Sequence, residues 1–103
     1  MRKTFNKLVR DKIPEIITAH GEIATVRTLD DDEFKRELIK KLGEEYREFL
    51  EDNSSEELAD IIEVVEALKS IIATPAEVER IRAEKAEQRG TFEHRIFLEY
   101  TDD

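Results

Sequence analysis

The stretch EEYREFLEDNSSEELAD, residues 44–60, decides how this chain folds. Acidic residues at its two ends lie in apolar, helix-periodic surroundings, and the polar residues 52–55 between them favour a turn. If the chain reverses there, two antiparallel helices form, and residues equally far from the turn lie level with one another. Glu45 then faces Asp60, and Glu48 faces Glu57. Four carboxylates in one patch repel each other unless a cation lies between them, so the stretch predicts a site for a divalent metal ion.

Size and composition indicate a small helical protein. A chain of 103 residues forms one domain with a modest core, and 42% charged against 39% hydrophobic residues indicates helices with solvated outer faces. The net charge of −9 disfavours nucleic acid as a partner but leaves room for a small phosphorylated ligand. Cysteine is absent, which excludes disulfides and thiolate metal sites. No apolar run approaches the ~20 residues that span a bilayer and no signal-peptide core is visible, so a cytoplasmic protein without a membrane partner is expected.

The spacing of apolar residues predicts a mainly α fold with four helices and a small two-stranded accessory element. The expected helices cover residues 9–19, 32–51, 54–73 and 74–89. Capping signals precede three of them, at residues 30–33, 54–57 and 74–77, and Gly90 ends the last. Residues 23–29 and 92–100 are rich in β-branched or alternating apolar residues, and we expect them to form two strands that pair with each other.

The four acidic residues have an ordinary explanation and a more specific one. The chain has 26 acidic residues, so pairs three apart on one helix face arise by chance, and a solvated surface explains any single pair. Three features favour a metal site for the four residues together. They lie level with one another across the turn, and like charges on one helix cost about a few tenths of a kcal/mol per pair. The third feature is the position of Glu45 in an apolar stripe. Glu45 continues an apolar helix stripe formed by Phe34, Leu38, Leu42 and Phe49.

An all-oxygen ligand set favours Mg²⁺, with Mn²⁺ as a substitute. Since Mg²⁺ is commonly held by carboxylates, waters and substrate phosphates together, an acidic site of this kind suits a phosphorylated substrate. Metal-assisted hydrolysis of a phosphoanhydride is the reaction class that follows.

The pattern EExxE followed by ExxD on two antiparallel helices resembles the all-α nucleoside triphosphate pyrophosphohydrolases, which include the MazG-like enzymes and phosphoribosyl-ATP pyrophosphohydrolase. NKLVRDKIPE at residues 6–15, and the segment from Lys85 through RGTF at residues 89–92 to Arg95 and Ile96, resemble the small single-domain, house-cleaning branch. The resemblance implies one MazG-like domain over residues 1–103. It also implies Mg²⁺-dependent cleavage of the α–β phosphoanhydride of a nucleoside triphosphate, giving the monophosphate and pyrophosphate. The gap of residues 49–56 between the two motifs is shorter than is typical of MazG-like enzymes.

The resemblance assigns roles to particular residues. The implied metal ligands are Glu45, Glu48, Glu57 and Asp60. Glu48 is also a catalytic candidate, as is Glu44, which either orients a water as a base or faces solvent. Positive side chains are expected to bind the phosphates; the candidates are Lys7, Arg10, Lys85 and Arg89. Lys85 continues an apolar stripe of the last helix and is expected to face inward, although ordinary surface ion pairs explain each basic residue equally well.

Two other functions fit the same sequence. One keeps the chemistry and changes the substrate to phosphoribosyl-ATP, an intermediate of histidine biosynthesis. The other is a non-enzymatic acidic helical module that binds a partner or a structural cation. In each case the small core and the apolar helices predict a homodimer or a higher homo-oligomer.

Overall fold

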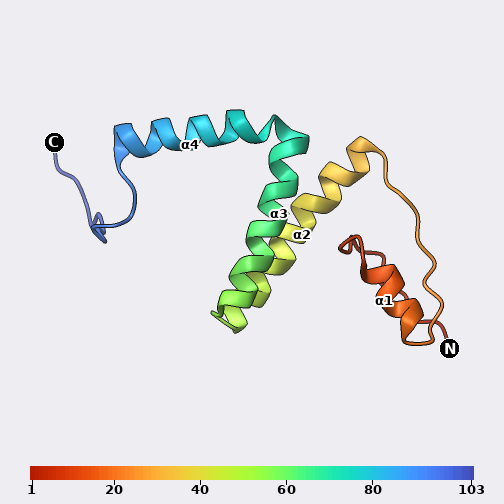
Figure 1. The fold of residues 1–103 in the computed structure, drawn as a ribbon. Helices are drawn as coiled ribbons and strands as arrows, with labels where there is room; N and C mark the ends of the chain where they lie inside the picture. Colours follow the sequence, from red (N-terminus) through yellow and green to blue (C-terminus); the bar gives the residue numbers. More distant parts are fainter.

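Two helices joined by a short connection form the centre of the molecule (Figure 1). The computed structural model describes residues 1–103, in which α2 (Asp31–Glu51) and α3 (Ser55–Ile72) pack against each other as an antiparallel hairpin. Residues 52–54 make the turn between them. The mainly α fold with four helices is therefore confirmed, and the hairpin lies where residues 44–60 predict it.

Side-chain caps at the helix starts explain why these helices begin where they do. The Asp30 carboxylate accepts a hydrogen bond from the backbone N–H of Glu33 at 2.9 Å, at the start of α2. The hydroxyl of Ser54 accepts one from the N–H of Glu57 at 3.2 Å, at the start of α3. Thr74 does the same for α4 (Pro75–Arg89) at 3.1 Å. Each bond satisfies a backbone donor that has no partner inside the helix, and the three predicted helix starts are confirmed to within a residue.

The first helix is shorter than predicted. The expected helix covers residues 9–19, whereas α1 runs over Ile13–Ala19. Pro14 is the reason, because its ring and its missing N–H are tolerated only in the first turn of a helix. The helix therefore begins just before Pro14, and residues 9–12 remain outside it.

The predicted two-stranded element is wrong. Residues 23–29 and 92–100 have no regular secondary structure. The first segment leads from α1 to α2, while the second follows α4 and ends at the opposite side of the molecule (Figure 1). A strand needs a neighbouring strand to pair its N–H and C=O groups, and α4 carries the second segment away from its expected partner. Apolar side chains in both segments stay exposed, among them Ile23, Phe97 and Leu98.

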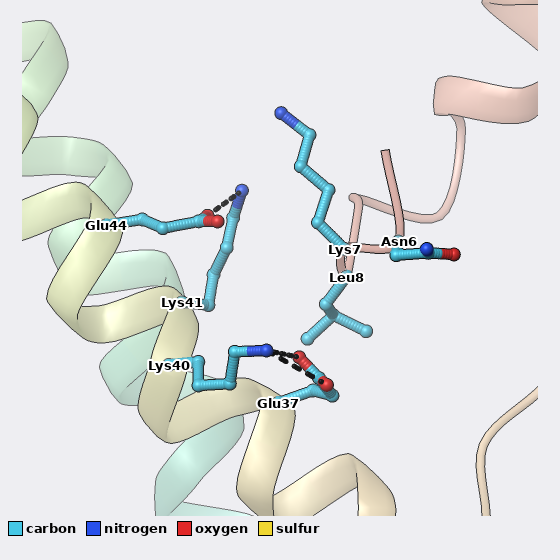
Figure 2. A pocket seen from close by; sticks show the side chains of 7 residues that line it. All are labelled: Asn6, Lys7, Leu8, Glu37, Lys40, Lys41 and Glu44. Atoms are coloured by element: carbon cyan, nitrogen blue, oxygen red, sulfur yellow. Dashed lines mark hydrogen bonds and ion pairs between the residues drawn. The ribbon is translucent and has the colours of Figure 1, made fainter. Parts of the chain in front are cut away.

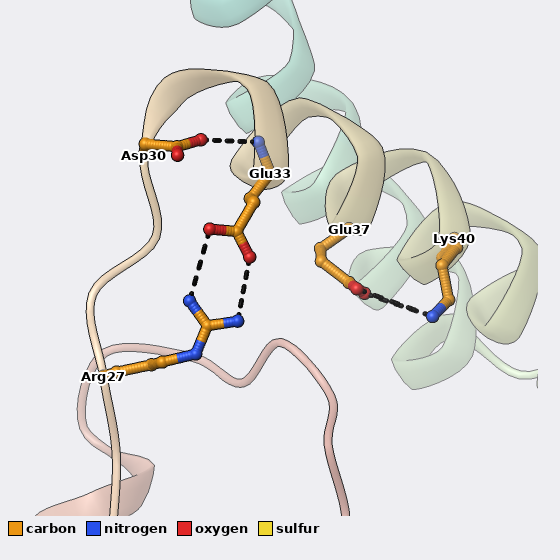
Figure 3. Close-up of polar contacts among 5 residues, drawn as sticks. All are labelled: Arg27, Asp30, Glu33, Glu37 and Lys40. Atoms are coloured by element: carbon orange, nitrogen blue, oxygen red, sulfur yellow. Dashed lines mark hydrogen bonds and ion pairs between the residues drawn. The ribbon is translucent and has the colours of Figure 1, made fainter.

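An exposed ion pair attaches the connection before α2 to that helix (Figure 3). Arg27 donates two hydrogen bonds to the carboxylate of Glu33, at 3.3 and 2.8 Å. The hydrogen bond from Arg27 lowers the pKa of Glu33, while the same contact raises the pKa of Arg27. Because both side chains face solvent, the pair orients the segment but adds little to stability.

The core is very small for a chain of this length. Only Leu38 and Val64 are buried apolar residues, with 3% and 8% of their surface exposed, and both belong to the hairpin. Of the remaining helices, α4 packs only on α3, and α1 packs on none of the others. The molecule is elongated, with extents of 63 × 31 × 24 Å. None of its helices combines the length and the apolar character needed to cross a membrane.

Because the hairpin has so little core, its stability depends strongly on Leu38. We expect Leu38→Ala to lower the free energy of unfolding by about 2–5 kcal/mol, through lost burial and an unfilled cavity. Urea denaturation followed by far-UV circular dichroism measures this. Leu98→Ala is the matched control, since 74% of Leu98 is exposed, and it should change stability by less than about 0.5 kcal/mol. Equal effects of the two substitutions would contradict this description of the core.

Candidate metal centre

Four carboxylates meet between the two helices of the hairpin. Glu45 and Glu48 come from α2, and Glu57 and Asp60 come from α3. One oxygen of each lies within 4.8 Å of the corresponding oxygens of the other three. Neighbouring ligand oxygens around Mg²⁺ lie about 3 Å apart and opposite ones about 4 Å apart, given metal–oxygen distances of about 2.1 Å. Small rotamer changes would therefore bring this set to the distances of a metal site.

Burial makes the cluster unfavourable without a cation. Glu45 is only 7% exposed, and its Oε2 is buried without a hydrogen-bond partner. The Oε2 of Glu57 is buried without a partner as well. An unpaired buried carboxylate oxygen costs free energy that a metal ligand bond or a hydrogen bond would recover. These two oxygens are the observation that distinguishes the cluster from an ordinary acidic surface.

The charges in the cluster affect one another's ionisation. Burial raises the pKa of Glu45, and the neighbouring charge of Glu48 raises it further. Burial also raises the pKa of Glu57, together with the charges of Glu48 and Asp60. A divalent cation bound among the four carboxylates would lower the pKa of Glu45 and of Glu57, because a nearby opposite charge favours the ionised carboxylate.

Two basic side chains already contact the cluster. Arg10, from the segment before α1, donates a hydrogen bond from Nη2 to Oδ1 of Asp60 at 2.7 Å. The ammonium of Lys41 lies 3.4 Å from Oε1 of Glu45 and 3.1 Å from Oε2 of Glu44. Burial opposes the charge on Lys41, but Glu44 and Glu45 outweigh it and raise the pKa of Lys41. The cluster is thus partly neutralised by the protein itself.

Lys41 is a residue that sequence reasoning missed. A signal was present, since Lys41 lies four residues before Glu45 and therefore on the same face of α2. Glu44 lies on the neighbouring face and is partly exposed, with Lys41 as its ion-pair partner.

The predicted phosphate-binding residues fall into two groups. Arg10 lies at the cluster, and Lys7 lies close to it, in a cleft beside Lys41 (Figure 2). Lys85 and Arg89 belong to α4, which begins beyond the end of α3 opposite the cluster and leads away from the hairpin (Figure 1).

The prediction that Lys85 faces inward is wrong, because its side chain is exposed. The apolar stripe on which it was placed has almost nothing to pack against, since α4 contacts only the end of α3. Within one chain, Lys85 and Arg89 are therefore not brought to the carboxylates.

Comparisons with known proteins add one relative. A stretch of 42 residues is 52% identical to part of an uncharacterized protein of Mycolicibacterium smegmatis. The stretch covers 41% of this chain and 43% of that protein, so less than half of either is matched. No protein-family model matches the chain. No solved structure matches it either.

A metal site of this kind has a distinct stability signature. We expect Glu45→Gln to raise the melting temperature of the chelator-treated protein, because it removes one of four repelling carboxylates. The same variant should lose most of the stabilisation that Mg²⁺ confers on the wild type, since stabilisation follows affinity for the folded state. Thermal denaturation in chelator and in excess Mg²⁺ measures both effects.

Glu63→Gln is the matched control for this experiment, because Glu63 is an exposed glutamate of α3 outside the cluster. It should retain the full response to Mg²⁺. If Glu45→Gln and Glu63→Gln respond to Mg²⁺ alike, the four carboxylates do not hold the ion.

Proposed function

We propose that this protein is a Mg²⁺-dependent nucleoside triphosphate pyrophosphohydrolase of the all-α, MazG-like kind, with a house-cleaning role in nucleotide pools. The observation that carries the proposal is the cluster of four carboxylates on two antiparallel helices, with two buried oxygens that lack partners. The EExxE and ExxD spacing of these residues is the pattern that resembles the family. Basic side chains beside the acidic cluster add to the support, because a triphosphate needs both metal and cations.

In this proposal, some residues bind the metal ion and others contact the substrate. Glu45, Glu48, Glu57 and Asp60 would hold the metal ion, which would stabilise negative charge on the phosphates and help to activate a water. Water adds across the α–β phosphoanhydride, so that the bridging P–O bond breaks and nucleoside monophosphate and pyrophosphate leave. Arg10 donates a hydrogen bond to Asp60, and in this proposal its guanidinium also contacts a phosphate oxygen at the edge of the metal site.

A second copy of the chain is part of the proposal. Large apolar side chains are about half exposed along both helices of the hairpin; they are Ile39, Tyr46, Leu50, Leu58 and Ile62. Val65, Leu68, Ile72 and Val78 line an open apolar cleft where α3 meets α4. Two buried apolar residues, Leu38 and Val64, do not offset the conformational entropy of a 103-residue chain. A self-association interface supplies the missing burial.

Light scattering coupled to size exclusion tests the association. We expect the wild type to elute as a dimer or a higher oligomer at micromolar concentration, because exposed apolar surface on this scale is covered in stable proteins. Ile62→Lys should shift the protein to smaller species or unfold it, whereas Glu63→Lys, the neighbouring polar position, should leave the assembly unchanged. A folded wild-type monomer would overturn this part of the proposal.

The reaction is tested by a pyrophosphate-release screen over standard and modified nucleoside triphosphates and phosphoribosyl-ATP, with and without Mg²⁺. We expect release by the wild type only when Mg²⁺ is present. Glu48→Ala should lower the rate by more than about 100-fold, because residues that merely support metal ligands are already worth about 10- to 100-fold.

Glu63→Ala serves as the control in the screen and should hydrolyse like the wild type. Hydrolysis of phosphoribosyl-ATP alone would mean the same reaction on a different substrate. If a folded protein that binds Mg²⁺ released no pyrophosphate from any compound tested, the hydrolase would be excluded and the binding module would remain.

A further inference from the structure

A cleft rich in lysine lies beside the proposed metal centre (Figure 2). Its walls are the segment before α1 and the outer face of α2. Three lysines line it, Lys7 from the first wall and Lys40 and Lys41 from the second, together with Glu37 and Glu44. The cleft therefore carries an excess of positive charge in a protein whose net charge is −9.

Lys41 lines this cleft and also contacts the cluster of four carboxylates. Its side chain is only 19% exposed, and its ammonium lies within 3.4 Å of Glu45, one of the four clustered carboxylates. On the cleft side, Lys41 pairs with Glu44 at 3.1 Å. A group bound to Lys41 in place of Glu44 would thus lie next to a ligand of the metal ion.

The other two lysines differ in how they are held. Lys40 is 69% exposed and pairs with Glu37 at 3.5 Å (Figure 3). Lys7 has no carboxylate partner; its ammonium lies 5.7 Å from the ring centre of Phe5. Figure 2 shows Lys7 and Lys41 reaching into the same opening from the two walls. Because both residues line this cleft, an anion bound in it would meet the side chains of Lys7 and Lys41.

We propose that Lys41 and Lys7 form a phosphate subsite, which binds a phosphate group of the substrate next to the phosphate held by the metal. This proposal rests on the proposed function, since it assigns the metal site a phosphorylated ligand. A lysine ammonium suits a phosphate as a compact charge with three donors, and Mg²⁺ shares phosphate ligands with such groups. Glu44 is then the partner that orients the Lys41 side chain until the phosphate replaces it.

Calorimetric titration with inorganic pyrophosphate in the presence of Mg²⁺ tests the subsite without any turnover. We expect Lys41→Met to weaken pyrophosphate binding by about 10- to 100-fold, the effect of losing one charge-assisted hydrogen-bonding partner. Methionine keeps most of the aliphatic stem of this largely buried side chain. Lys41→Arg retains the charge and should keep much of the affinity.

Lys35→Met is the matched control, because Lys35 is an exposed lysine of α2 that does not line the cleft. It should change pyrophosphate affinity by less than about twofold, because an exposed charge outside the site is screened by solvent and salt. Lys7→Met, in the exposed N-terminal segment, should weaken pyrophosphate binding and decides the matter if Lys41→Met does not fold. Mg²⁺ binding without pyrophosphate should persist in all these variants.

The outcomes separate the subsite from the reaction. If pyrophosphate binds and Lys41→Met weakens it while no triphosphate is hydrolysed, the phosphate subsite stands and the hydrolase proposal fails. If the wild type hydrolyses triphosphates but Lys41→Met and Lys7→Met both bind pyrophosphate as tightly as Lys35→Met does, the subsite is overturned. Absence of pyrophosphate binding to the Mg²⁺-loaded wild type would overturn it as well.

Discussion

The repulsion between four carboxylates, held within 4.8 Å of one another, constrains the rest of this structure. The hairpin of α2 and α3 places them together, and the same packing shields Glu45 and Glu57 from water, which raises the pKa of both. Left alone, such a cluster would favour separation of the two helices. Arg10, from the segment before α1, and Lys41, from α2, neutralise part of this negative charge. A divalent cation would suit the negative charge that is left.

The hairpin is therefore both the core of the fold and the framework of the candidate site. Leu38 and Val64 are buried in the same contact that gathers the carboxylates, so the packing and the site depend on each other. The connection over residues 52–54 is short and Ser54 caps the start of α3, which keeps the two acidic motifs in register. Little apolar burial supports this arrangement within one chain. Under the proposed function, metal binding and self-association would supply further stability.

Local signals predicted the parts of the fold that depend on neighbouring residues. The capping side chains of Asp30, Ser54 and Thr74 marked three helix starts, because each satisfies a backbone donor within three residues. The prediction failed where a partner distant in sequence was needed. Residues 23–29 and 92–100 have the composition of strands, yet a strand exists only if another pairs with it. The orientation of α4 keeps these segments apart, and no local pattern encodes that orientation.

For the candidate site, the sequence by itself determined which carboxylates meet. The 3.6-residue period of a helix and one tight turn suffice to align Glu45 with Asp60 and Glu48 with Glu57. Only the tertiary structure decided which basic residues join them. It brings Arg10 to Asp60 across fifty residues and leaves Lys85 exposed on a helix that points elsewhere. The physical reason is that helix geometry fixes neighbours three and four residues apart, whereas contacts between separate segments depend on how the whole chain packs.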